Sequence, residues 1–261
     1  MESLLGENQM KRVFIMVWCF CIGLYAFEPQ STGVLLLHGK GGTPLKTWEH
    51  FQGALEKEGY SVMAKEMPWS KNRYIDKTYE ASLDEIKASI EELKTKGVKQ
   101  IVLIGHSMGA NVAIAYGSLE PLDALVVLAP GHNPNKMASY FKPSLELAKS
   151  MIDEGKGTSV ASFADTNVGK QFMKEMRADI YYSFFSLEGL SAMEIRAKYI
   201  PNTLPVLYIV GKNDPLTEKN GMHTFDAIPK TPKTQYVTVP ADHFGAVNAS
   251  VEEVLVWLKS L

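Results

Sequence analysis

The stretch that most constrains the fold is residues 101–113. An apolar run over 101–104 ends in the sequence Gly105-His-Ser-Met-Gly109, and small residues compatible with a helix follow at once. A Gly-x-Ser-x-Gly pattern in this context predicts a strand, a very tight turn and a helix. Side chains two positions before or after Ser107 would collide with the strand or the helix, so both positions need glycine. The turn would leave the serine hydroxyl exposed above the end of the strand.

Further apolar runs of strand length alternate with helical patterns along the chain. Strands are expected over 33–37, 60–67, 100–104, 124–129, 205–210 and 234–239, with helices that include 48–57, 79–93, 217–228 and 251–261. This alternation predicts a parallel sheet built from right-handed βαβ units. With 261 residues, 46% of them hydrophobic, the chain can bury one large core. We therefore expect an α/β fold with about six mostly parallel strands and helices on both faces of the sheet.

Residues 132–203 interrupt this alternation. We expect them to be mostly helical, with Leu145 and Ala148 on one helix face and Phe172 and Met176 on another. Because the insertion follows a strand's carboxyl end, it should lie over the mouth of the sheet, where loops build sites. The sequence thus predicts a helical cap within a single domain that spans 27–261.

The N-terminal 26 residues differ in kind from the rest. Lys11 and Arg12 precede an uncharged apolar stretch over 13–27, which is typical of a secretory signal and short for a membrane span. Translation from Met10 is an alternative start, and cleavage is expected near Ala26. The sequence therefore predicts an exported protein, periplasmic or secreted, and an uncleaved membrane anchor is the alternative.

The predicted mature chain is poor in the features that recruit metals or large charged partners. Both cysteines, Cys19 and Cys21, lie in the N-terminal segment, so the mature chain would have no disulfide or cysteine-bound metal. A net charge of −2 provides no basic field for nucleic acid or anionic membranes. No spacing of histidine and acidic residues resembles a metal site. We expect a small-molecule substrate, no cofactor, and membrane contact only through an uncleaved N-terminal segment.

Three reactive side chains each follow the carboxyl end of a predicted strand: Ser107, Asp214 and His243. Such strand ends meet at one edge of an open α/β sheet. A serine hydroxyl is a weak nucleophile and needs a base that takes its proton near neutral pH, which suits histidine. A carboxylate fixes the tautomer of that imidazole and stabilises its protonated form.

Negative charge that develops on a substrate oxygen needs amide donors. The backbone N–H of Met108 and one from the glycine-rich loop over 38–44 are placed to supply them. His38 and His106 are more simply explained as supports for the backbone of their own loops.

Together these motifs resemble the α/β-hydrolases. The resemblance rests on Leu-Leu-Leu-His-Gly over 35–39, Gly-His-Ser-Met-Gly, Gly-Lys-Asn-Asp over 211–214, and Asp-His-Phe-Gly over 242–245, and it covers about 33–261. It implies Ser107 as nucleophile, His243 as general base and Asp214 as its orienting acid. The family's first oxyanion donor falls on Lys40, or on Gly41 if the extra glycines shift it. Members commonly have two antiparallel strands before the His-Gly strand, whereas about six residues separate the expected cleavage site from Gly33, which implies a trimmed sheet.

The resemblance implies a serine hydrolase, carboxylesterase-like, that cleaves an ester of a small or medium substrate through an acyl-enzyme. The same residues would serve thioesters, amides or perhydrolysis, and a non-catalytic binding protein could retain the fold. Trp69, His132, Tyr182 and Phe184 are candidates for substrate contact. For the aromatic stretch over 181–185, packing between cap and sheet is the interpretation we favour.

Overall fold

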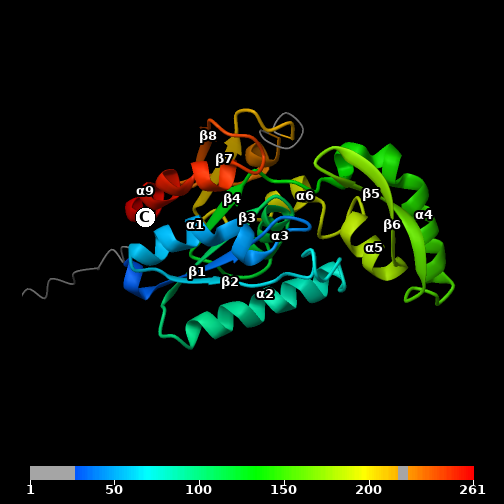
Figure 1. Ribbon diagram of the computed structural model, residues 1–261, viewed down its shortest axis with the longest axis horizontal. Coiled ribbons are helices and arrows are strands. Elements are labelled where there is room, and N and C mark those ends of the chain that lie inside the picture. The colour runs from blue at the N-terminus through cyan, green and yellow to red at the C-terminus, as the bar shows by residue number, and fades with distance from the viewer. Residues whose placement is uncertain (1–26, 217–222) are drawn as a thin grey trace, which may run out of the picture.

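The computed structural model describes residues 27–216 and 223–261, and six parallel strands form its central sheet (Figure 1). The strand order is β2-β1-β3-β4-β7-β8, which confirms the predicted parallel sheet. The strands are β1 (Thr32–Leu37), β2 (Ser61–Ala64), β3 (Gln100–His106), β4 (Ala124–Leu128), β7 (Val206–Gly211) and β8 (Gln235–Val239). The predicted signal over 1–26 lies outside the described residues, as do residues 217–222 at the start of a predicted helix.

Helices cover both faces of the sheet. One face carries α1 (Pro44–Lys57), α8 (Ala246–Ala249) and α9 (Val251–Ser260), and the other carries α2 (Tyr79–Lys94) and α3 (Met108–Gly117). In Figure 1, α1 lies above β1, and α2 lies below β1 and β2. Successive residues of β1 enter opposite layers, with Val34 and Leu36 in one apolar cluster and Leu35 and Leu37 in the other. A strand buried on both faces explains the continuous apolar run.

Most of the insertion between β4 and β7 forms a lobe at the right of Figure 1, and its last helix, over 193–197, contacts α3 (Met108–Gly117). Its elements are η2 (Pro134–Met137), α4 (Ala138–Asp153), β5 (Val160–Asn167), β6 (Lys170–Arg177), α5 (Ala178–Phe185) and α6 (Met193–Ala197). None of the helices within 27–216 and 223–261 combines the length and apolarity needed to cross a bilayer.

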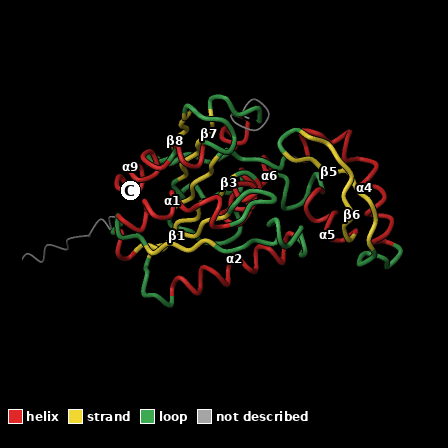
Figure 2. The backbone as a smooth tube through the Cα atoms, viewed as in Figure 1, coloured by secondary structure: helices red, strands yellow, loops and turns green. Residues whose placement is uncertain are grey.

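The prediction of a mostly helical cap is wrong for residues 160–177, which form an antiparallel hairpin of β5 and β6 (Figure 2). Phe172 and Met176 lie on β6 rather than on a helix. Their spacing of four residues puts two side chains on one face of a strand as readily as on one face of a helix. The hairpin turns at Val168 and Gly169, which both have positive φ. A β-branched residue seldom takes that conformation, so the turn lacked its usual sequence signal.

Candidate active site

Ser107 sits at the tight turn between β3 and α3, with φ 55° and ψ −118°. This backbone is strained for a residue with a side chain, and the surrounding packing holds it in place. A Cβ at Gly105 would lie 2.2 Å from the carbonyl oxygen of Gly109, and a Cβ at Gly109 would lie 2.2 Å from that of Leu37. Both glycines are therefore needed for α3 to pack against the strands beside it.

The structure brings the side chains of Ser107, His243 and Asp214 into one hydrogen-bonded chain. Asp214 follows β7 and His243 follows β8, and both side chains are 2% exposed. His243 Nδ1 lies 2.8 Å from Asp214 Oδ2, and His243 Nε2 lies 2.9 Å from Ser107 Oγ. Because the carboxylate accepts from Nδ1–H, Nε2 is left as the acceptor for the serine hydroxyl. The other carboxylate oxygen accepts from the backbone N–H of Leu216 at 2.8 Å, which fixes the carboxylate plane.

His106 supports the loop that carries His243. Its Nε2 lies 2.9 Å from the backbone oxygen of His243, and because a carbonyl can only accept, this nitrogen carries the proton. Burial lowers the pKa of His106 to about 4, so the ring is neutral at pH 7. Asp242, adjacent to His243 in sequence, instead accepts from the N–H of Gly245 at 2.7 Å. Asp214 is therefore the acid that contacts the imidazole.

The loop after β1 lies against the serine. A Cβ at Gly39 would be 2.9 Å from Ser107 Cβ and 3.5 Å from Ser107 Oγ. The N–H of Gly41 already donates to the carbonyl of Trp69 at 2.8 Å. The N–H groups of Lys40 and Met108 donate to no acceptor among the described residues, and both residues line the cavity at Ser107. Of the two predicted alternatives for the first oxyanion donor, the geometry favours Lys40 over Gly41.

Comparison with known proteins agrees with this architecture. Residues 28–243 match the α/β-hydrolase family described as "Serine aminopeptidase, S33". The chain belongs to this family. A curated relative, "Putative esterase/lipase 2" of Mycoplasma pneumoniae, is 29% identical over 112 residues, and the match spans 41% of the chain and 41% of that relative's length.

Solved structures show the same fold at low sequence identity. A structure from the work on LipS and LipT, two metagenome-derived lipolytic enzymes, superposes with a TM-score of 0.63 at 15% identity, over 89% of this chain and 95% of that chain. A monoacylglycerol lipase of Paleococcus ferrophilus superposes with a TM-score of 0.61 at 20% identity, again over 89% and 95%. At these identities the likeness establishes the fold of the hydrolase and not its substrate.

In this hydrolase Trp69 has a supporting position, contrary to its prediction as a substrate contact. Its side chain is 1% exposed, and its indole N–H donates to the backbone oxygen of His38 at 2.6 Å. His38 Nδ1 donates to the backbone oxygen of Gly39 at 2.8 Å, as expected for a histidine that supports its own loop, and its Nε2 accepts from the N–H of Met67 at 3.1 Å. Trp69 thus packs under the glycine-rich loop and away from the cavity.

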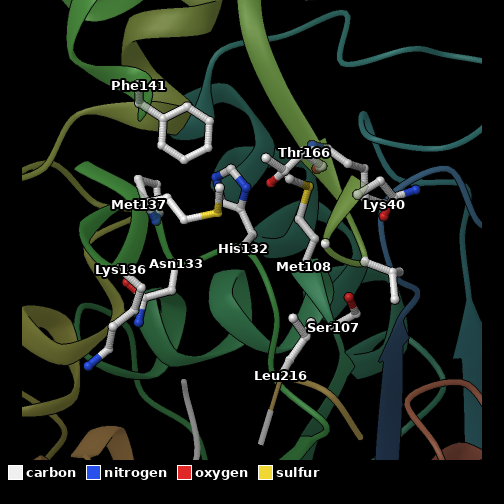
Figure 3. Close-up of a pocket in the computed structure, with 14 residues that line it drawn as sticks. Lys40, Ser107, Met108, His132, Asn133, Lys136, Met137, Phe141, Thr166 and Leu216 are labelled. Atoms are coloured by element: carbon white, nitrogen blue, oxygen red, sulfur yellow. Dashed lines mark hydrogen bonds between the residues drawn. The ribbon is translucent and has the colours of Figure 1, made fainter. Parts of the chain in front are cut away.

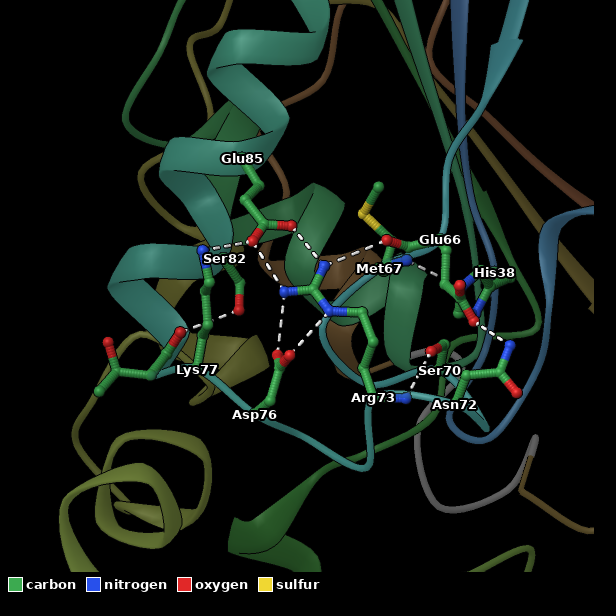
Figure 4. Close-up of polar contacts among 11 residues, drawn as sticks. His38, Glu66, Met67, Ser70, Asn72, Arg73, Asp76, Lys77, Ser82 and Glu85 are labelled. Atoms are coloured by element: carbon green, nitrogen blue, oxygen red, sulfur yellow. Dashed lines mark hydrogen bonds and ion pairs between the residues drawn. The ribbon is translucent and has the colours of Figure 1, made fainter. Parts of the chain in front are cut away.

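An ion-pair network ties the loop after β2 to α2 (Figure 4). The Arg73 guanidinium donates to both carboxylate oxygens of Glu85 at 2.7 and 2.8 Å and to both of Asp76 at 2.9 Å. The Arg73 hydrogen bond holds the pKa of Glu85 at about 2. The segment between β2 and Arg73 includes Met67 and Trp69, which hydrogen-bond to His38 at the start of the glycine-rich loop. By holding this segment, the network supports that loop indirectly.

A cavity of about 70 Å³ opens beside Ser107 (Figure 3). Of the four predicted substrate contacts only His132 lines it. The ring of His132 is held by its Nε2–H, which donates to the backbone oxygen of Phe184 at 2.7 Å, and burial lowers the pKa of His132 to about 4. Phe184 is fully buried, 5.0 Å from the ring of Tyr79 on α2, and Tyr182 lines a separate groove on the cap. Phe184 therefore packs between the cap and the body of the protein, as the favoured interpretation of this stretch holds, whereas Tyr182 is half-buried on the outer side of the cap.

Most of the cavity wall was missed by sequence reasoning. Its apolar part comes from the elbow, η2, α4, the hairpin turn and the loop after β7, namely Met108, Pro134, Met137, Phe141, Val168 and Leu216. These residues come from separate parts of the chain, and no local pattern marks them as neighbours. Within the two described ranges, no group of three or more histidine, cysteine and acidic side chains is arranged to hold a metal ion.

Proposed function

We propose that the protein is a serine hydrolase that cleaves a carboxylic ester of a small or medium substrate through an acyl-enzyme. The observation that carries this proposal is the hydrogen-bonded chain from Asp214 through His243 to Ser107 at the elbow. Membership of a hydrolase family and the partial match to a putative esterase/lipase support it.

The proposed reaction follows from the position of each group. Ser107 Oγ attacks the ester carbonyl while His243 Nε2 takes its proton, and Asp214 stabilises the imidazolium. The backbone N–H groups of Lys40 and Met108 donate to the oxygen that becomes negative. His243 then gives the proton to the leaving alcohol, and in the second half activates water to release the acid.

The cavity supports a short acyl chain. Its walls are largely apolar and its volume is about 70 Å³, whereas one water molecule needs ~10–15 Å³ of such cavity space. A short chain fills such a space, and a long one would require the cap to move. We therefore propose esters of short acyl chains as the preferred substrates.

The family's description raises a peptidase as the second candidate. An aminopeptidase must bind the cationic amino terminus of its substrate, which calls for acidic side chains at the site. Among the described residues that line the cavity, the charged ones are Lys40 and Lys136, and none is acidic. The nearby carboxylates of Asp165 and Glu194 are already paired with these lysines, so the cavity offers no free carboxylate to an amino terminus, which favours the ester. Thioesters use the same machinery and are compared directly in the test.

The test pairs turnover with covalent labelling. The wild type should hydrolyse p-nitrophenyl butyrate and react with a fluorophosphonate probe, and Ser107→Ala should do neither. His243→Ala and Asp214→Asn should each lower turnover by about 10³-fold or more. Ser159→Ala, an exposed serine on the cap, serves as the matched control and should match the wild type. Labelling that persists in Ser107→Ala would refute the nucleophile, and a folded wild type that never labels would favour a binding protein. Butyryl ester, thioester and anilide of equal chain length then identify the bond.

We also propose that the protein is exported, on the evidence of the basic pair and apolar stretch before Ala26. Sequencing the N-terminus of the protein recovered from cell fractions tests this. A mature chain that begins near Phe27 supports export with cleavage. An intact Met1 or Met10 in the membrane fraction would indicate an anchor instead.

A further inference from the structure

A buried ion pair joins the oxyanion loop to the cap. The Lys40 ammonium donates to Asp165 Oδ1 and, at 2.9 Å, to the backbone oxygen of Thr166, both on β5. It also lies 5.5 Å from the centre of the Phe185 ring on α5. The side chains of Lys40 and Asp165 are 10% and 1% exposed. Figure 3 shows Lys40 and Thr166 together at one wall of the cavity, beside Ser107.

The cap holds Asp165 in a fixed position. The preceding residue, Ala164, accepts a hydrogen bond from the Tyr181 hydroxyl at 2.9 Å, and its N–H donates to Ser144 Oγ at 2.8 Å. Asp165 Oδ1 also accepts from the N–H of Thr166 at 2.7 Å. These bonds come from α4 and α5, so the carboxylate is anchored to the body of the cap. It can therefore serve as a rigid partner for a group on a less constrained loop.

The oxyanion loop is such a loop. Lys40 is the one residue with a side chain in the sequence Gly39-Lys-Gly-Gly42, and glycine-rich backbone has many accessible conformations. Backbone hydrogen bonds hold it from Gly41 onward, through the N–H of Gly41 to Trp69 and that of Gly42 to Gly39. The Gly39 carbonyl of the peptide that precedes Lys40 accepts from the Gly42 N–H at 3.0 Å and from His38 Nδ1 at 2.8 Å. The Lys40 N–H donates to no acceptor among the described residues, and the lysine side chain adds the link from this residue to the cap.

We propose that Asp165 is a positioning residue for the oxyanion hole. Through the Lys40 side chain it holds the Lys40 backbone N–H toward the oxygen of a substrate bound at Ser107. This inference rests on the proposed function, since it assigns a cap residue to the stabilisation of the negative oxygen. It also makes the cap a part of the catalytic apparatus in addition to a cover over the cavity.

The first test is Asp165→Asn, which keeps the shape of the side chain and removes its charge. Acylation should slow because a donor that is misplaced by a fraction of an ångström stabilises the transition state less. We expect kcat for p-nitrophenyl butyrate and the rate constant of fluorophosphonate labelling both to fall about 10-fold or more, with KM within about threefold. The phosphonate oxygen occupies the same hole, so labelling reports on it whichever bond the enzyme cleaves naturally. Asp153→Asn is the matched control, because it removes an exposed cap carboxylate that pairs with Lys149 on the same helix.

A double-mutant cycle separates positioning from a general loss of stability. Lys40→Met keeps the backbone N–H and removes the ammonium, and it should lower the labelling rate as Asp165→Asn does. Combined in one chain, the two substitutions leave neither charge of the pair, so this variant should fold even if Asp165→Asn alone does not. Because Asp165 acts through Lys40, the double variant should be no slower than Lys40→Met alone. All rates are measured at least 10 °C below the lowest melting temperature.

Each outcome decides one question. The inference is overturned if the labelling rate constant of Asp165→Asn or of the double variant lies within twofold of the wild-type value. It is also overturned if the two substitutions lower the labelling rate independently, so that their effects multiply in the double variant. A wild type that labels but does not hydrolyse esters overturns the proposed bond, while the labelling rates still test Asp165. A folded wild type that never labels overturns both.

Discussion

Gly131→Ala should inactivate the protein while leaving it folded. Gly131 follows β4, and its N–H donates to the backbone oxygen of Ser107 at 3.1 Å. A Cβ at this position would lie 2.7 Å from Ser107 Oγ but 3.5 Å from Ser107 Cα. The contact that is too close therefore involves the reactive oxygen alone. Gly131 does not have the positive φ that would exclude alanine, so its backbone accepts the new side chain.

The size of the effect follows from the serine rotamer. The hydroxyl must leave its present position, and the next staggered rotamer moves Oγ by about 2.3 Å. This movement breaks the 2.9 Å contact with His243 Nε2. A misplacement of ~1 Å costs about 100-fold in rate, so we expect kcat/KM to fall at least ~100-fold, or about 2.7 kcal/mol in the activation barrier. The free energy of unfolding should change by less than about 1 kcal/mol, because one side-chain torsion relieves the contact.

The assay measures p-nitrophenyl butyrate hydrolysis and fluorophosphonate labelling beside urea unfolding. Gly53→Ala is the matched control, since Gly53 is exposed on α1 and a Cβ there would have no neighbour within 4 Å. It should keep wild-type activity and gain ~1 kcal/mol of stability from the better helix propensity of alanine. If Gly131→Ala retained activity within threefold of the wild type, the geometry assigned to Ser107 would be wrong. A loss of activity that matched a loss of folded protein would also refute the reasoning.

Three further substitutions test the Arg73–Glu85 ion pair, the neutral state of buried His106 and the size of the cavity. The pKa of Glu85, held at about 2 by Arg73, lies below its unfolded value. The stability that this pair contributes is therefore present above pH 4.5 and lost as pH falls toward 2. Urea unfolding of wild type and Arg73→Ala should differ at pH 7 and converge as the pH approaches 2. Burial lowers the pKa of His106 to about 4, so between pH 6.5 and 4 the unfolded chain binds more protons than the folded one. The free energy of unfolding should therefore fall as the pH is lowered from 6.5 to 4, and it should fall less steeply in His106→Gln. The two slopes should differ by at most ~1.4 kcal/mol per pH unit. Phe141→Ala should enlarge the cavity and raise the ratio of kcat/KM for octanoate over butyrate esters, by up to about fourfold for each methylene newly buried; an unchanged ratio would place the acyl chain elsewhere.

The sheet and the triad geometry were predictable because their signals are local. Each strand is a short apolar run, and Ser107, Asp214 and His243 each follow such a run directly. In a parallel sheet, strand ends converge whatever the connections between them contain. The order of the strands depends on which distant segments pair, and it was not predicted.

The cap was harder to predict, for a physical reason. A spacing of four residues fits both a helix and a strand, so the positions of Phe172 and Met176 could not distinguish them. Three of the four candidates for substrate contact do not line the cavity. Trp69, Tyr182 and Phe184 are large aromatics near predicted loops and cap, but their rings pack under a loop, on the outer cap or against α2. Residue type alone does not reveal which way a side chain faces.

The local sequence around Lys40 does indicate that its side chain needs a partner. A lysine between glycines lies in a loop that packs against the reactive serine, and a long cationic side chain there must either reach solvent or find a buried partner. Its partner, Asp165, is 125 residues away on a strand that was not predicted. The ammonium is buried, which lowers the pKa of Lys40, and a buried charge persists only where its counter-charge is fixed. A substitution that moves β5 should therefore alter catalysis through Lys40 as well as through Thr166 and Asn167, the β5 residues in the cavity wall.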